Sequence, residues 1–253
     1  ARYYSSDLSI WLSVDPMSDK YPSLSPYVYC ADNPVKLVDP KGEEIDIDGF
    51  RYMPGQACPE EASKSTRNKW NTMNKIYMHE SGKSVIDVLD KSESCYSISS
   101  EYQAGGSGAF EPNYNGEGKR DGGTIYTNGK DNNISILSHE VFHAYQQEKG
   151  QGGRSIHNEV EAYLFAEMIS GNNNNLSFRN NIEGEYSEKQ IKYILSLNNI
   201  RLKGYSQSDF NTIVDGFKES ATSNSYGTYN DYHQKLDNQS SSLISPLFKI
   251  NNK

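Results

Sequence analysis

Two histidines four residues apart constrain the possible folds of this chain more than any other feature of its sequence. His139 and His143 lie in an amphipathic stretch from about residue 133 to residue 149, a pattern that predicts a helix. Side chains that often cap helices precede the stretch, and Gly150 follows it. Residues four apart lie on one face of a helix, so both imidazoles can reach one metal ion at about 2.0–2.1 Å. We therefore expect a helix that carries two ligands of a zinc ion.

Glu140 completes the pattern H-E-x-x-H, which is typical of zinc hydrolases. On the helix its carboxylate falls beside the metal rather than on it, where it can take a proton from water. Zinc lowers the pKa of the water that it binds toward about 7, which produces hydroxide at neutral pH. Glu140 is therefore the predicted catalytic base, and one zinc ion per chain is the predicted cofactor. A chance spacing of unrelated side chains is the competing interpretation, and the predicted helix argues against it.

A third metal ligand is expected downstream of His143, because a catalytic zinc takes three protein ligands plus water. The candidates are His157, Glu159 and Glu161, at or near the start of a second predicted helix at about residues 158–169. Glu159 shares a helix face with small alanines, whereas Glu161 lies among large apolar side chains. Small residues allow helices to approach closely, which favours Glu159, with Glu161 and His157 as alternatives.

The pair Asn158-Glu159, with Ala162 after it, resembles the third-ligand helix of the gluzincin metallopeptidases, such as thermolysin and the zinc aminopeptidases. The resemblance implies that Glu159 is the third ligand. It also implies an α+β, zincin-like metallopeptidase domain, with a small antiparallel sheet and the HExxH helix at its active site. Tyr163 stands where these enzymes often carry an acid, so the resemblance does not explain what orients His139.

A short predicted strand, Thr124, Ile125 and Tyr126, comes shortly before the HExxH helix. In metallopeptidases a strand near this helix commonly holds an extended substrate by main-chain hydrogen bonds, so these three residues are the candidate substrate-binding edge. An ordinary sheet strand without a ligand is the alternative. Zinc peptidases also often place a polar side chain opposite the metal to stabilise the oxyanion, and the conceivable donors are Tyr229, Tyr232 and His233.

Composition excludes several other classes of protein. The net charge of −8, with dispersed basic residues, argues against a nucleic-acid partner. No stretch approaches the roughly 18 apolar residues of a membrane span. The three cysteines, Cys30, Cys58 and Cys95, are too scattered for a disulfide framework or a second zinc site. A chain of 253 residues with 35% hydrophobic content can bury a core, and we expect one main domain plus an appendage.

Residues 1–42 differ in composition from the rest of the chain, because they are rich in proline and aromatic residues. They contain Arg2-Tyr3-Tyr4, Leu12-Ser13-Val14-Asp15-Pro16, Ser25-Pro26-Tyr27-Val28-Tyr29 and a final stretch from Asn33-Pro34 to Asp39-Pro40-Lys41-Gly42. These four motifs, in this order, resemble the end of the Rhs/YD-repeat associated core. The resemblance implies a short, strand- and turn-rich core segment at 1–42, followed by a variable toxin domain. We therefore expect a linker at 43–59, the metallopeptidase domain at 60–222 and a polar tail at 223–253.

The two resemblances together imply an effector that is secreted or delivered to a target cell and is of bacterial origin. Its partners would be a protein or peptide substrate and a cognate immunity protein. Glu43 follows Gly42 where self-cleaving members of the repeat family carry an apolar residue, which argues against self-release at Asp39-Pro40. The expected function is a zinc metalloendopeptidase. The alternatives are a non-catalytic binding or carrier module with a structural or decayed zinc site, and a zinc hydrolase of another substrate.

Overall fold

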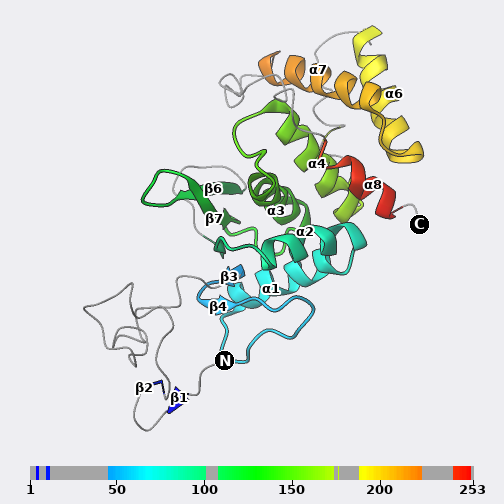
Figure 1. Ribbon diagram of the computed structural model, residues 1–253. Coiled ribbons are helices and arrows are strands. Elements are labelled where there is room, and N and C mark those ends of the chain that lie inside the picture. The colour runs from blue at the N-terminus through cyan, green and yellow to red at the C-terminus, as the bar shows by residue number, and fades with distance from the viewer. Residues whose placement is uncertain are drawn as a thin grey trace. The chain divides into compact units, whose positions relative to one another are not determined.

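The structure, a computed structural model, describes residues 4–5, 10–11, 45–100, 108–173, 176, 188–223 and 242–251 (Figure 1). The chain divides into two compact units, Ala1–Gly42 and Glu43–Lys253. The division falls at the residue where the resemblance to the Rhs core ends. In the first unit, β1 (Tyr4–Ser5) and β2 (Ile10–Trp11) pair antiparallel, with Tyr4 opposite Trp11. All other described elements belong to the second unit.

One mixed sheet contains the five described strands of the second unit, in the order β4-β3-β5-β7-β6. These strands are β3 (Ile45–Ile47), β4 (Phe50–Arg51), β5 (Tyr96–Ser99), β6 (Ala109–Tyr114) and β7 (Arg120–Tyr126). β3, β5 and β7 run parallel, whereas β4 and β6 pair antiparallel to their neighbours. The fold class α+β is therefore confirmed, but the expectation of an antiparallel sheet is wrong.

The connections explain why the sheet is mixed. The connection from β3 to β5 contains β4 and two helices, and a crossover of this length lets two neighbouring strands run in the same direction. The β3–β4 hairpin instead turns through Asp48 and Gly49, with φ values of 53° and 86°. Two consecutive residues with positive φ form the tight turn that suits antiparallel strands, and glycine adopts it without strain. The amide of Gly49 also donates to Oδ1 of Asp46 at 2.9 Å.

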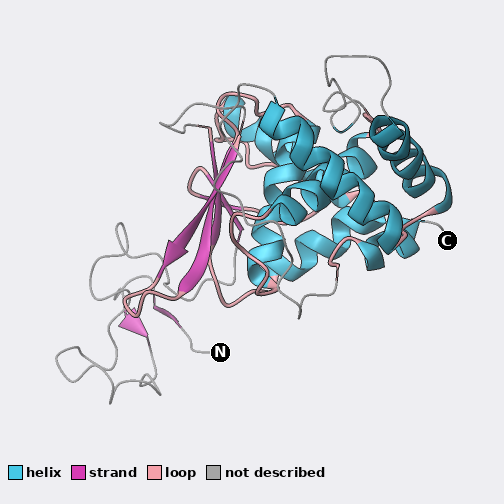
Figure 2. Cartoon of the chain, turned by 90° about the horizontal axis from the view of Figure 1, so that it is seen from above, coloured by secondary structure: helices cyan, strands magenta, loops and turns pink. Residues whose placement is uncertain are grey.

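The helices lie mostly on one side of this sheet, as Figure 2 shows. The described helices are α1 (Lys64–Tyr77), α2 (Glu80–Asp90), α3 (Ile134–Glu148), α4 (Ile156–Ser170), α6 (Glu188–Lys203), α7 (Gln207–Ser223) and α8 (Ser245–Asn251). Asn133 caps α3, because its side chain accepts a hydrogen bond from the amide of Ile136. None of the described helices is long and apolar enough to cross a membrane.

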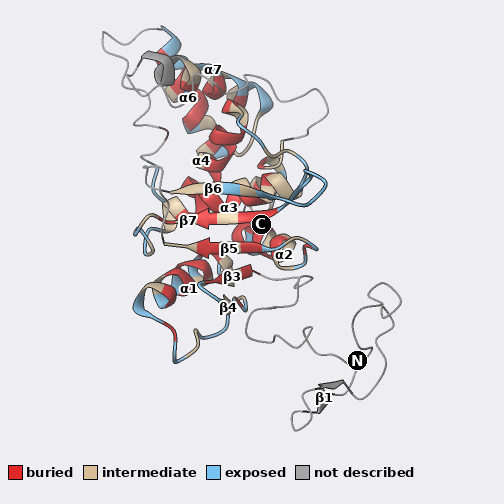
Figure 3. Cartoon of the chain, turned by 90° about the vertical axis from the view of Figure 1, so that its left-hand side faces the viewer, coloured by how far each residue is buried: buried red, intermediate tan, exposed pale blue. Residues whose placement is uncertain are grey.

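The core joins the sheet to the helices. Ile47, Ile98 and Ile125, from the three parallel strands, are at most 1% exposed and belong to the same apolar cluster as the helices. Figure 3 shows the inner strands buried, whereas β6 also carries exposed positions. At the centre of the helical layer α3 packs against α4, where the rings of Phe142 and Phe165 stack at 4.8 Å. This packing brings the two helices with the predicted ligands together.

Each predicted flank of the domain contains regular structure in its described residues. The expected linker 43–59 contributes β3 and β4 to the sheet, because its apolar residues Ile45, Ile47 and Tyr52 are buried in the core. The expected polar tail is wrong for residues 242–251, which form α8 and the turn before it. Ile244 and Leu247 are at most 3% exposed, so burial of apolar surface holds this segment on the domain.

Candidate metal centre

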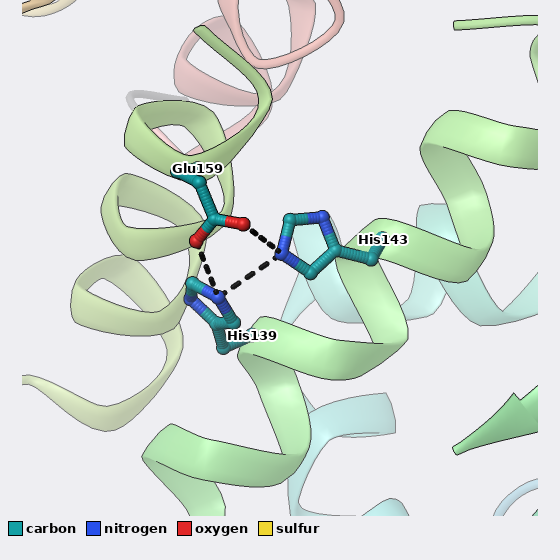
Figure 4. A group of neighbouring side chains, drawn as sticks. All are labelled: His139, His143 and Glu159. Atoms are coloured by element: carbon teal, nitrogen blue, oxygen red, sulfur yellow. Dashed lines mark hydrogen bonds and ion pairs between the residues drawn. The ribbon is translucent and has the colours of Figure 1, made fainter. Parts of the chain in front are cut away.

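Two adjacent helices bring three ligand-type side chains together (Figure 4). Residues 139 and 143 of α3 present their imidazoles one turn apart, and α4 presents the carboxylate of Glu159 opposite them. Nε2 of His139 lies 3.1 Å from Nε2 of His143. The two oxygens of Glu159 lie 3.3 Å from Nε2 of His139 and 3.4 Å from Nε2 of His143. The three side chains therefore point at one common centre.

These spacings are close to those around a metal ion. Ligand atoms of a tetrahedral ion with bonds of about 2.0–2.1 Å to nitrogen and oxygen lie about 3.3–3.4 Å apart. The two imidazole nitrogens lie 3.1 Å apart, a different oxygen of Glu159 faces each of them, and one ligand atom from each residue lies within 4.8 Å of the other two. His139, His143 and Glu159 thus form a group that could hold a metal ion, the one such group of three or more ligand-type side chains found in the described residues.

Burial strengthens the electrostatic coupling within this group. His139 is 9% exposed and Glu159 is 7% exposed. Burial opposes a charge on Glu159, but the neighbouring histidines outweigh it, and the pKa of its carboxyl is held well below the ordinary value. Burial likewise opposes a charge on His143, yet the carboxylate of Glu159 raises the pKa of its imidazole to about 9. In the metal-free protein, this shift in pKa favours a protonated His143 at neutral pH.

This proton gives opposite pH dependences for stability and for metal binding. The pKa of His143 in the folded protein, about 9, lies above its ordinary value of 6.5. Its protonation therefore stabilises the metal-free fold fully below about pH 6.5, and this contribution is lost as the pH rises through 9. Metal binding needs the neutral imidazole of His143. The affinity for zinc should therefore rise over the same pH interval, by at most about tenfold per pH unit. Thermal unfolding with chelator and zinc titrations from about pH 6 to pH 10 measure the two trends.

The control for this prediction is Glu159→Gln, which removes the charge that raises the pKa of His143. The metal-free variant should lose most of the change in stability across this interval. A wild-type protein whose metal-free form becomes more stable between pH 6.5 and pH 9 would contradict the assignment of the proton to His143.

Glu140 lies beside the three candidate ligands but is not one of them. It is 8% exposed, and burial raises the pKa of its carboxyl against the lowering influence of His139 and His143. Its Oε1 faces the start of β6, where a Cβ atom added to Gly108 would lie 3.1 Å from that oxygen. A carboxylate whose proton affinity is raised, next to a metal-ligand group, suits proton transfer.

The two histidines are supported in different ways. Nδ1 of His143 is 2.8 Å from Oε1 of Gln146, a hydrogen bond within α3. Nδ1 of His139 has no hydrogen-bond partner among the described residues. The ring of Tyr163 instead packs against the ring of His139, with centroids 4.3 Å apart. Tyr163, four residues after Glu159 on α4, therefore places an aromatic ring against His139.

Neither alternative third ligand belongs to the metal-ligand group. Glu161 is on α4, but its carboxylate points elsewhere and accepts hydrogen bonds from Gln146 and from the segment before α8. His157 lies in the first turn of α4, with its ring 6.1 Å from that of Phe210. His157 and Glu161 are each two residues from Glu159, and residues two apart on a helix point in different directions. They therefore cannot face the same centre as Glu159.

The predicted substrate-binding edge is wrong, because Thr124, Ile125 and Tyr126 do not lie at an edge. They belong to β7, which pairs with β5 on one side and with β6 on the other. Its main-chain groups are thus engaged in the sheet. The edge strand on this side of the described sheet is β6, which pairs with β7. The three oxyanion candidates, Tyr229, Tyr232 and His233, lie outside the described residues.

Two residues near the site were missed by the sequence analysis: Gly108 and Gln146. Gln146 follows His143 by three residues, so the helical spacing alone could have indicated their contact. Tyr163 was noted in the sequence, but its contact with the ring of His139 was not predicted. No local signal indicates Gly108, because tertiary packing alone brings it near Glu140.

Comparisons with protein-family models, with curated proteins and with solved structures gave no match for this chain.

Proposed function

We propose that this chain binds one zinc ion through His139, His143 and Glu159 and hydrolyses peptide bonds. The observation that carries the proposal is the convergence of these three side chains, from two helices, at 3.1 to 3.4 Å from one another. Two imidazoles and one carboxylate are a donor set that zinc accepts. Three protein ligands leave a fourth position for water or substrate, as catalytic zinc sites require.

Glu140 is the group that moves protons in this proposal. A bound zinc ion would supply a Lewis acid that polarises the substrate carbonyl and lowers the pKa of water. Glu140 accepts the proton of the attacking water and then delivers it to the leaving amine. Its burial supports this role, because the raised pKa lets the carboxylate hold a proton between the two steps.

The described edge strand supports a peptide as the substrate. β6 pairs with β7 on its inner side, and α3 packs on these two strands. An extended peptide can add to a sheet edge through main-chain hydrogen bonds, which suit any peptide sequence. The start of β6 lies near Glu140, because Gly108 immediately precedes this strand. A peptide added along β6, the outer strand of the described sheet, would therefore pass close to the proposed base.

The motifs of residues 1–42 support a second part of the proposal. Their resemblance to the end of an Rhs core suggests that the hydrolase is an effector domain, secreted or delivered to a target cell. Its substrate would then be a protein of that cell, and an immunity protein would protect the producer. This part rests on the sequence motifs alone.

The rival function is a non-catalytic binding module with a structural metal site. Burial of the site is compatible with it, because Glu140 and Glu159 are at most 8% exposed, but structural zinc sites usually have four protein ligands and this group has three. Zinc content of the purified chain, together with cleavage of an unfolded protein substrate with and without chelator, tests the proposal. We expect one zinc ion per chain and proteolysis that stops on chelation and returns with zinc. One zinc ion per chain without any proteolysis supports the binding module.

A substitution at Gly108 tests the position of Glu140. In Gly108→Ala the new methyl group would lie 3.1 Å from Oε1 of Glu140 and 2.6 Å from Cγ2 of Ile136. We expect turnover to fall by about 10-fold or more, because the contact with Ile136 forces α3 or the start of β6 to shift, Oε1 of Glu140 must also give way, and small displacements of a catalytic group have large effects on rate. Zinc content should not change. Steady-state kinetics of peptide cleavage measures the effect.

Gly116→Ala is the matched control, because a Cβ atom at Gly116 meets nothing within 4 Å. This variant should cleave peptides at the wild-type rate. Wild-type turnover in Gly108→Ala as well would show that Glu140 does not need its present position.

A further inference from the structure

We infer that Gln146 is a positioning residue that fixes the ring of His143, so that Nε2 is the atom available to the metal ion. The inference rests on the metal site proposed above. Gln146 is fully buried, one turn beyond His143 on α3. Its Oε1 lies 2.8 Å from Nδ1 of His143. The question is which of these two atoms carries the hydrogen, because a neutral imidazole has one donor and one acceptor nitrogen.

The surroundings of the Gln146 amide answer this question. Its Nε2 donates to the carbonyl oxygen of Asn158 at 3.0 Å and to Oε2 of Glu161 at 3.1 Å. A carbonyl oxygen can only accept, so the NH₂ group of Gln146 must face Asn158. Its oxygen must then face His143. Because that oxygen can only accept, Nδ1 of His143 carries the hydrogen.

This hydrogen bond selects the form of His143 that binds metal through Nε2. With the hydrogen on Nδ1, the lone pair of a neutral ring is on Nε2, the atom that faces His139 and Glu159. The hydrogen bond also restricts rotation of the ring. Partners of this kind typically fix the tautomer and the orientation of metal-binding histidines.

Glu161 holds Gln146 in turn. One oxygen of its carboxylate accepts from Gln146 and from Nε2 of Gln151, the latter at 3.0 Å. The other oxygen accepts from Oγ of Ser242 and the amide of Leu243, each at 2.9 Å. A buried carboxylate surrounded by donors is a strong acceptor for the amide of Gln146. The chain of contacts therefore runs from the segment before α8, through Glu161 and Gln146, to the metal ligand.

The variant Gln146→Met tests the inference, because it keeps the length of the side chain and removes both the acceptor and the donor. We expect zinc affinity to fall about 10- to 100-fold, the usual effect of removing such a partner. The matched control is Gln147→Met, which makes the same change one residue later and also removes a hydrogen bond, from Gln147 to the carbonyl oxygen of Gly122. It should bind zinc with wild-type affinity. Unchanged affinity in Gln146→Met, or an equal loss in both variants, overturns the inference.

A second measurement needs no variant and so does not depend on whether Gln146→Met folds. Nitrogen-15 NMR of the zinc-loaded wild-type protein should show His143 with a hydrogen on Nδ1 and the metal on Nε2. Coordination of zinc through Nδ1 of His143 overturns the inference. A wild-type chain that binds no zinc overturns instead the proposed function on which the inference rests.

Discussion

Glu140→Gln is expected to reduce peptide hydrolysis by about 10²- to 10⁴-fold while one zinc ion stays bound. Glutamine has nearly the same size as glutamate but cannot accept a proton from water at neutral pH. The metal-ligand group consists of His139, His143 and Glu159, so it stays intact in this variant. The measurement combines the rate of peptide cleavage with the zinc content of the same preparation.

Glu148→Gln provides the matched control on the same helix. Glu148 accepts hydrogen bonds from Ser92 and Tyr96 and does not belong to the group of candidate ligands, so its role is structural. This variant should keep both zinc and activity. If Glu140→Gln cleaves peptides at the wild-type rate, general base catalysis by Glu140 is excluded. If neither the variant nor the wild type cleaves peptides although both bind zinc, the binding module is the better description.

Glu159→Gln is expected to lower zinc affinity by more than the ~10- to 100-fold that loss of a supporting partner costs. The amide removes the negative charge that neutralises the metal ion. It also places a donor among atoms that converge at 3.3 and 3.4 Å. Zinc titration against a competing chelator, at a fixed pH near 8, gives the affinities. Proteolysis should be lost together with zinc.

Glu161→Gln distinguishes the two acidic residues of α4. Glu161 supports Gln146 and does not face the candidate metal centre. The zinc affinity of Glu161→Gln should therefore fall by about 10- to 100-fold at most. A larger loss in Glu161→Gln than in Glu159→Gln would reverse the assignment of the third ligand. If both variants bind zinc with the affinity of the wild type, a carboxylate does not complete the site.

Much of the candidate site was predictable because its main determinants are local. The i, i+4 spacing places His139 and His143 on one face of any α-helix, whatever surrounds it. The alanines that follow Glu159 on its face predicted a close approach to a neighbouring helix, and Ala162 and Ala166 are fully buried. Within each helix, the spacing of residues in the sequence therefore predicted which side chains lie on the same face.

The sheet was less predictable, because strand direction depends on connections and not on the strands themselves. In β5, Tyr96 and Ile98 alternate with serines, which is the local pattern of a strand. Nothing within four residues shows whether its neighbours run parallel to it. The placement of 124–126 at an edge was wrong for the same reason, since β6 occupies the outer position.

By itself, the sequence determined the two helices of the site, the α+β class and the pair of histidines, because helical periodicity and apolar spacing act over a few residues. Only the tertiary structure decided which acid faces those histidines, which strand lies at the edge, and that residues 242–251 pack on the domain. These features depend on contacts between residues far apart in the chain. The hydrogen bonds from Ser242 and Leu243 to Glu161 span about 80 positions, a separation over which local patterns carry no information.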